Sequence, residues 1–224
     1  MSNIDKKTLY FLEDLSKNNN RPWFQENKPR YELAHSNMKE FLKGLLDEFQ
    51  KVDHIEKMKL FRIYRDVRFS KDKTPYKNSF GVGFHREKPQ LRGGYYLHIE
   101  PGGTFVGGGF WQPNKEDLQR IREEFAFDDQ PFRKIISDPG FEKAFPKGIE
   151  GDALKTAPKG FDREHPAIDL IRRKSFVASK SFTDEEVLSK DFAEKVIDTF
   201  MVFRPWFDYF SDVLTTNANG EKIV

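Results

Sequence analysis

The 224-residue sequence contains no cysteine. This absence excludes a disulfide scaffold, a thiolate metal site and a cysteine nucleophile, and it is typical of a reducing compartment. Glycine and proline are not in excess, at 15 and 12 residues, which excludes collagen-like and low-complexity chains. No apolar run approaches the roughly 18 residues of a membrane helix, and residues 1–7 are polar where a signal peptide has its apolar core. We therefore expect a cytoplasmic protein with no membrane partner.

Familiar catalytic motifs are also missing from the sequence. It contains no nucleophile elbow, no P-loop and no dinucleotide-binding fingerprint. None of its five histidines lies four residues from another, so no helical metal site is encoded locally. We predict no cofactor and no metal. The separated histidines His85, His98 and His165 leave open whether tertiary structure brings them together around a metal ion.

The composition is that of a folded chain. Aromatic residues make up 15% of it, and disordered chains lack such surface-burying groups. The length suits one domain with a sizeable core, and no linker or internal repeat divides the sequence. We predict one domain over residues 1–224, with a loose tail at 217–224.

Apolar residues recur at helical spacing near both ends of the chain. Leu9, Leu12 and Leu15 form one stripe, and a longer helix is predicted to begin at Pro29, because proline at the first helical position removes no intrahelical hydrogen bond. Further helices are predicted after Asn114, at 132–137, at 165–171, after the capping-box residue Thr183, and over 192–210 with a break or kink at Pro205.

The middle of the chain has an extended pattern. We predict strands at 60–65, 80–86, 95–100 and 104–110, and another at 174–179. A Pro-Gly-Gly turn at 101–103 predicts a hairpin, and alternation places Tyr96, His98 and Glu100 on one strand face. The prediction is an α+β fold with a mainly antiparallel sheet of about four to six strands, covered on one face by helices.

Three consecutive glycines, at 107–109, lie in the fourth predicted strand. Such a run is typical of a bulge or of a place where another group approaches the backbone closely. We expect Gly107 and Gly108, with Tyr96 on the neighbouring strand, to line a shallow ligand groove. A bulged strand without a ligand is the alternative.

Charge is distributed unevenly along the chain. Residues 59–92 hold ten basic and three acidic residues, a net charge of +7, whereas the rest holds 28 basic and 33 acidic residues, a net charge of −5. Such asymmetry attracts anions, and guanidinium groups bind carboxylate or phosphate through paired hydrogen bonds. The predicted anion-binding side chains are Arg62, Arg65, Arg68, Lys71, Lys73 and Lys77. In the alternative, Asp66 and Asp72 pair with these cations in an ordinary solvated turn.

Three classes of function fit this segment. The first is a site that binds, or binds and transforms, a phosphorylated or carboxylated small molecule, with His98, Tyr76 and Glu100 as candidate catalytic groups. The second is a nucleic-acid-binding module in which the basic segment contacts phosphates and aromatic residues such as Tyr64, Tyr76 and Tyr96 stack on bases. The third is an interaction module for an acidic protein. The isoelectric point near 8.5 favours the small ligand over nucleic acid. Whether a reaction is catalysed, and the oligomeric state, stay open.

Several segments together resemble a known family. RIYRDVRFSKDKTPYK at 62–77 is similar to the signature of a mainly bacterial family catalogued as domain of unknown function two-four-six-one. GYYLHIEPG at 94–102 and GGGFWQP at 107–113 resemble its second and third blocks, NNNRPWF at 18–24 resembles its start, and PKG at 158–160 followed by HP at 165–166 resembles a late block. The resemblance implies that these segments belong to one domain. It implies no activity, because the family has none established.

Overall fold

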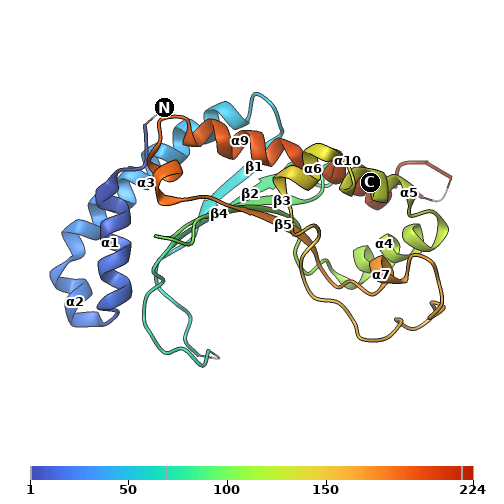
Figure 1. The fold of residues 1–224 in the computed structure, drawn as a ribbon, viewed down its shortest axis with the longest axis horizontal. Helices are drawn as coiled ribbons and strands as arrows, with labels where there is room; N and C mark the ends of the chain where they lie inside the picture. The colour runs from blue at the N-terminus through green and yellow to red at the C-terminus, as the bar shows by residue number, and fades with distance from the viewer. Residues whose placement is uncertain (1, 69, 218, 224) are drawn as a thin grey trace. The chain divides into compact units, whose positions relative to one another are not determined.

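Five strands form an antiparallel sheet whose order follows the chain, β1-β2-β3-β4-β5 (Figure 1). Successive strands along the chain are thus neighbours in the sheet, including β4 and β5, which a long helical connection separates. The computed structural model describes residues 2–68, 70–217 and 219–223. The strands are β1 (Ile55–Leu60), β2 (Phe80–Arg86), β3 (Gly94–Ile99), β4 (Phe105–Phe110) and β5 (Phe176–Ser181).

Helices occupy both ends of the chain and the long connection between β4 and β5. They are α1 (Lys6–Lys17), α2 (Arg21–Glu26), α3 (Lys28–Phe49), α4 (Lys115–Phe127), α5 (Gln130–Ile136), α6 (Pro139–Ala144), α7 (Ile168–Ile171), α8 (Asp184–Leu188), α9 (Phe192–Val202) and α10 (Arg204–Thr215). The predicted α+β class, antiparallel sheet and helical end regions are confirmed. No helix within the described ranges is both long and apolar enough to span a bilayer.

Local sequence explains where several helices begin and end. Asn114 accepts a hydrogen bond from the Asp117 amide at 2.8 Å and begins α4, and Thr183 forms the predicted capping box with Glu186. The break predicted near Pro205 separates α9 from α10. Helix α6 was not predicted from the sequence, and it begins directly after the helix predicted at 132–137. Its N-terminus is capped by the Asp138 carboxylate, which accepts from the amide of Gly140 at 2.8 Å.

The first strand lies earlier than predicted. It spans Ile55–Leu60 rather than 60–65, and the chain then leaves the sheet in a segment that returns at β2. We call residues 61–79 the arm. Its two sides pair with each other, since the Arg65 amide donates to the Pro75 carbonyl at 2.9 Å and the Lys77 amide to the Ile63 carbonyl at 2.7 Å. Residues 63–65 therefore pair with the other side of the arm and not with a strand of the sheet.

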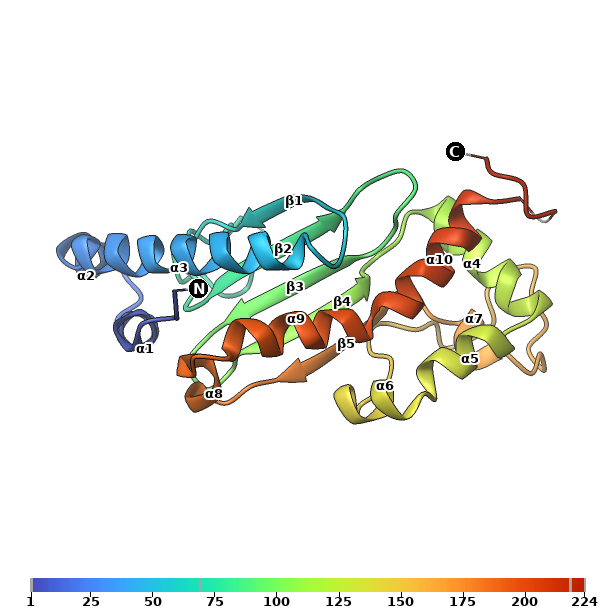
Figure 2. The same ribbon diagram turned by 90° about the horizontal axis from the view of Figure 1, so that it is seen from above.

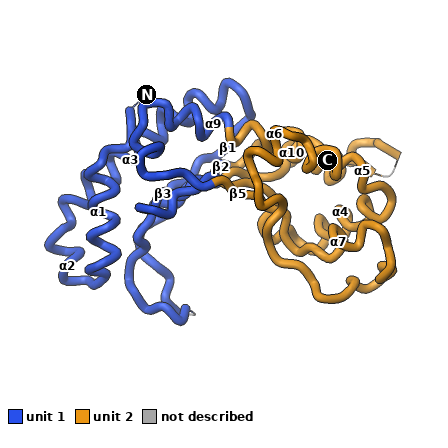
Figure 3. Tube along the Cα trace, in the orientation of Figure 1, with its two compact units in different colours: residues 1–84, 96–106, 181–198 blue, residues 85–95, 107–180, 199–224 orange. Residues whose placement is uncertain are grey.

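The chain packs as two compact units (Figure 3). Unit 1 comprises residues 1–84, 96–106 and 181–198, and unit 2 comprises 85–95, 107–180 and 199–224. In unit 2, a cluster of aromatic rings packs around α10, with Phe207 at 4.8 Å from Tyr95 and Phe210 at 5.1 Å from Phe132 between ring centroids. Each ring buries a large apolar area, so these contacts dominate the packing of this unit.

In unit 1, α3 covers one face of the strands. Figure 2 shows α3 running alongside β1 and β2. Phe49 of α3 contacts Phe84 of β2 edge-on at 5.8 Å, and Phe41 stacks on Phe192 at 5.8 Å. All four rings are buried. Strand alternation consequently directs Gly81, Tyr96, His98 and Glu100 to the opposite face, on the side from which the arm extends in Figure 1.

Candidate functional site

Three polar side chains of β3 and its end form a hydrogen-bonded row, which we call the β3 triad. The Tyr96 hydroxyl lies 3.3 Å from His98 Nδ1, and His98 Nε2 lies 2.9 Å from a Glu100 carboxylate oxygen. A carboxylate only accepts hydrogen bonds, so Nε2 carries the imidazole proton toward Glu100. His98 Nδ1 is then left as an acceptor for the Tyr96 hydroxyl. The predicted residues Tyr96, His98 and Glu100 are thus brought together.

Glu100 is held in place by further bonds. The Asn78 side-chain amide donates to its other carboxylate oxygen, and the Glu100 amide donates to the Thr104 hydroxyl at 3.2 Å, which itself donates to the Glu100 carbonyl at 3.0 Å. Both carboxylate oxygens are engaged, so Glu100 orients the imidazole ring and sets its tautomer. Asn78 was not singled out from the sequence, where its position next to Lys77 in the arm was the only available signal.

Aromatic rings and a glycine enclose the β3 triad. Phe105 stacks on the His98 ring at 4.8 Å, and Phe61 lies 6.4 Å from the Tyr96 ring. A Cβ atom on Gly81 would lie 2.4 Å from the Tyr96 hydroxyl oxygen, so glycine at 81 is what lets Tyr96 lie across β2. Burial raises the pKa of the Tyr96 hydroxyl, so this group stays protonated at neutral pH.

Cationic groups of β1 and the arm lie beside Phe61. The ammonium groups of Lys59 and Lys77 lie over its ring, 5.2 and 5.8 Å from the centroid. Burial lowers the pKa of Lys77, and the positive charges of Arg62 and Arg65 lower it further. We call Arg62, Arg65 and Lys77 the cation cluster. Among the described residues, neither Arg62 nor Lys77 has a carboxylate within ion-pair distance.

Two predicted anion-binding arginines have acidic partners inside the arm. Arg65 pairs with Asp72 and also donates to the Tyr76 carbonyl at 3.3 Å. Arg68 binds Asp66 through two nitrogens at 2.7 and 3.0 Å, and this pairing lowers the pKa of Asp66. The Arg68 side chain is 76% exposed, and ion pairs in such surroundings contribute little to stability. The solvated-turn alternative therefore describes Arg68 well and Arg65 in part.

The lysines near the turn of the arm lie apart from the cation cluster. Lys71 is exposed, and the Lys73 ammonium donates to the Val67 carbonyl at 2.8 Å. These contacts shape the turn, together with Asp72, which accepts from the Thr74 amide and hydroxyl at 2.9 and 2.8 Å. The six predicted basic residues therefore do not converge on one point.

Other predicted site residues have packing roles in the structure. Tyr76 is buried and stacks on Phe24 at 3.9 Å, which makes it an anchor of the arm. Gly107 is buried, and a Cβ on Gly108 would lie 3.0 Å from the Phe203 ring. The group that approaches Gly108 closely is thus an aromatic ring of the core in unit 2.

The separated histidines have different surroundings. His165 lies with Nε2 at 3.2 Å from the Ala126 carbonyl, and its Nδ1 accepts from the Ala167 amide at 3.1 Å. His98 belongs to the β3 triad, and His85 is exposed. In the part of the chain that the structure describes, no group of three or more possible metal ligands is found.

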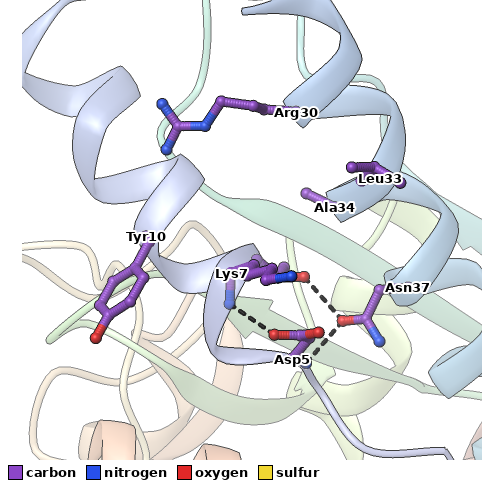
Figure 4. A pocket seen from close by; sticks show the side chains of 8 residues that line it. Asp5, Lys7, Tyr10, Arg30, Leu33, Ala34 and Asn37 are labelled. Atoms are coloured by element: carbon purple, nitrogen blue, oxygen red, sulfur yellow. Dashed lines mark hydrogen bonds between the residues drawn. The ribbon is translucent and has the colours of Figure 1, made fainter.

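A pocket of about 300 Å³ lies between α1 and α3 (Figure 4). Its polar groups already bond one another: the Asp5 amide and the Thr8 hydroxyl both donate to the Asn37 side-chain oxygen at 2.8 Å. Leu33 and Tyr10 are exposed at its edge. Because these polar groups are mutually satisfied, we place the candidate site at the β3 triad and the cation cluster instead.

These observations define a class of protein: an α+β chain whose sheet is covered by helices and carries the β3 triad beside the basic arm. A family model described as conserved hypothetical protein (DUF2461) matches residues 7–209. The chain belongs to this family, and the expected membership is confirmed. No curated protein and no solved structure matches the sequence.

Proposed function

We propose that this protein binds a phosphorylated or carboxylated small molecule at the cation cluster, next to the β3 triad. The observation that carries the proposal is the environment of Lys77. Its ammonium group is half-buried and its pKa is lowered by burial and by Arg62 and Arg65. A perturbed ionisable group with like-charged neighbours is typical of a binding site.

An anion would relieve this repulsion. The charges of Arg62 and Arg65 disfavour the charged form of Lys77, because like charges that lie close together repel one another. A phosphate or carboxylate placed between Arg62 and Lys77 replaces repulsion by attraction to each cation. The guanidinium group offers two parallel donors and the ammonium group a point charge, which together suit these anions.

Substitution of Lys77 tests the proposal. Chemical-shift titrations with inorganic phosphate, phenyl phosphate and acetate would be compared between the wild type, Lys77→Met and Lys115→Met. Lys115 is an exposed lysine at the start of α4, so its variant removes the same charge from unit 2. We expect Lys77→Met to weaken phosphate binding about tenfold, the effect of about 1.4 kcal/mol, and Lys115→Met to change it less than twofold. Equal affinities of the wild type and Lys77→Met would refute the proposal.

Nucleic acid is the second candidate ligand. The observation that favours it is the exposure of the arm, where Tyr64 is 48% exposed and Arg62, Arg68, Lys71 and Lys73 are exposed along the segment. Exposed cations beside an aromatic ring suit phosphates and a stacked base. A short single-stranded oligonucleotide should then bind with a steep salt dependence and lose affinity in Tyr64→Ala. Binding that survives this substitution, or a shallow salt dependence, argues for the small anion.

A further inference from the structure

We propose that Tyr96 is a nucleophile that takes the phosphoryl group of a phosphate ester, with His98 as its general base and Glu100 as the group that orients His98. This inference rests on the proposed function, because the cation cluster supplies the attraction for the phosphate. A nucleophile, a base in hydrogen-bond reach and a third group that orients the base is the arrangement required for covalent catalysis. The β3 triad has these three parts in this order.

Hydrogen bonding assigns the direction of proton movement. His98 Nε2 donates to Glu100, which leaves the lone pair of Nδ1 toward the Tyr96 hydroxyl. The proton that His98 is placed to accept is therefore the phenolic proton of Tyr96. The separation of 3.3 Å is long for a hydrogen bond, but such bonds shorten when the substrate is bound and charge develops.

The ligand meets Tyr96 rather than His98. One face of the imidazole is covered by Phe105 at 4.8 Å, both ring nitrogens are engaged within the β3 triad, and the His98 side chain is only 17% exposed. The Tyr96 ring lies 6.4 Å from the Phe61 ring, and the Lys77 ammonium group lies over the Phe61 ring. Tyr96 is thus the member of the β3 triad that packs near Phe61, the ring beneath the Lys77 ammonium group.

The position of Tyr96 is fixed before a ligand binds. Its ring lies over Gly81, where any Cβ atom would meet the hydroxyl oxygen. Asn78 and Thr104 hold Glu100 at the other end of the row. A nucleophile held in one place lowers the entropy cost of reaching the reacting geometry.

The reaction has two steps. In the first, a bond forms between the Tyr96 oxygen and phosphorus while the bond from phosphorus to the leaving oxygen breaks. The phenolic proton passes to His98 Nδ1, and the leaving oxygen takes a proton from water. In the second step, water attacks the phosphorus of the phosphotyrosine, and the proton that this water loses neutralises the hydroxide left by the first step. The tyrosine oxygen departs and regains its proton from His98. The net reaction is hydrolysis of the ester to an alcohol and inorganic phosphate, with no change of oxidation state.

The test is a rapid-mixing experiment with p-nitrophenyl phosphate, followed by acid quench and peptide mass mapping. Phosphate on a tyrosine oxygen survives acid, whereas phosphate on a histidine nitrogen does not. We expect release of nitrophenolate together with one phosphoryl group on the peptide that contains Tyr96. Tyr96→Phe should abolish both, and His98→Gln should slow formation at least 100-fold, the lower range for loss of a general base. Tyr10→Phe, which changes an exposed tyrosine of α1, should react like the wild type.

Two controls separate the possible failures. Inorganic phosphate binding, measured on the wild type, Tyr96→Phe and His98→Gln, reports the cation cluster, and thermal melting reports folding. If phosphate binds through Lys77 but the wild type gives no phosphotyrosine, this inference is overturned and the proposed function stands. If neither occurs, both are overturned. A phosphoryl group that survives only an alkaline quench and maps to His98 also overturns the role of Tyr96.

Discussion

Replacing Gly81 by alanine provides the sharpest structural test of the β3 triad. The new Cβ would lie 2.4 Å from the Tyr96 hydroxyl oxygen and 3.2 Å from the carbon that bears it. Overpacking of this kind costs about 1–3 kcal/mol, and alanine recovers about 0.5–1 kcal/mol because it loses less backbone entropy than glycine. We therefore expect Gly81→Ala to destabilise the wild type by about 0–2.5 kcal/mol.

The same substitution in a Tyr96→Phe background should behave differently. Without the hydroxyl oxygen, the closest remaining contact is the ring carbon at 3.2 Å, so the clash is largely removed and the gain from alanine remains. Gly81→Ala should then be neutral or stabilising. The double-mutant cycle would give a coupling energy of about 1–2 kcal/mol, read from urea midpoints at constant m-value. An equal cost of Gly81→Ala in both backgrounds would refute the placement of Tyr96 over Gly81.

Three further predictions concern the arm. The pKa of Lys77 is lowered in the folded protein, so the unfolded chain binds more protons between that lowered pKa and the ordinary value of 10.5. The free energy of unfolding should therefore rise with pH across this window. Denaturation of Lys77→Met should lack this rise, and an unchanged rise would contradict the lowered pKa. Asp72→Asn frees Arg65 from its carboxylate partner and should strengthen phosphate binding about threefold or more at low salt. Weaker binding in this variant would mean that the ion pair holds Arg65 in its binding position. Phe24→Leu removes the ring that stacks on Tyr76 at 3.9 Å, a contact of about 0.5–1.5 kcal/mol. The substitution should speed hydrogen exchange at the Lys77 amide. Exchange as slow as in the wild type would show that Phe24 does not anchor the arm.

The helices and most strands were predictable because their signals are local. The stripe of Leu9, Leu12 and Leu15 matches α1 at Lys6–Lys17, and the alternating residues at 80–86 match β2. Capping depends on residues within one turn, so the start of α4 after Asn114 could also be read directly. The boundary of β1 was wrong because period-2 alternation does not reveal which partner a strand pairs with. Residues 63–65 pair across the arm instead.

The candidate site was only partly predictable from the residues. Alternation along β3 was enough to place Tyr96, His98 and Glu100 on one face. It was not enough to find Asn78, which reaches Glu100 from another segment of unit 1. Tyr76 and Tyr64 are alike in sequence context, but a stacking partner on α2 buries the first and leaves the second exposed. Burial by a distant element leaves no mark in local sequence.

By itself, the amino-acid sequence determined the fold class, the family, the excess of positive charge at 59–92 and the shared face of the β3 triad, because each depends on composition or on residues close together in the chain. Only the tertiary structure decided which cations already have partners. Asp72 engages Arg65, and Asp66 engages Arg68, while Lys77 is left against Phe61 with like-charged neighbours. Charge pairing depends on distances of a few ångströms, which local sequence does not fix; the pair of Arg65 and Asp72 forms across a turn of the arm.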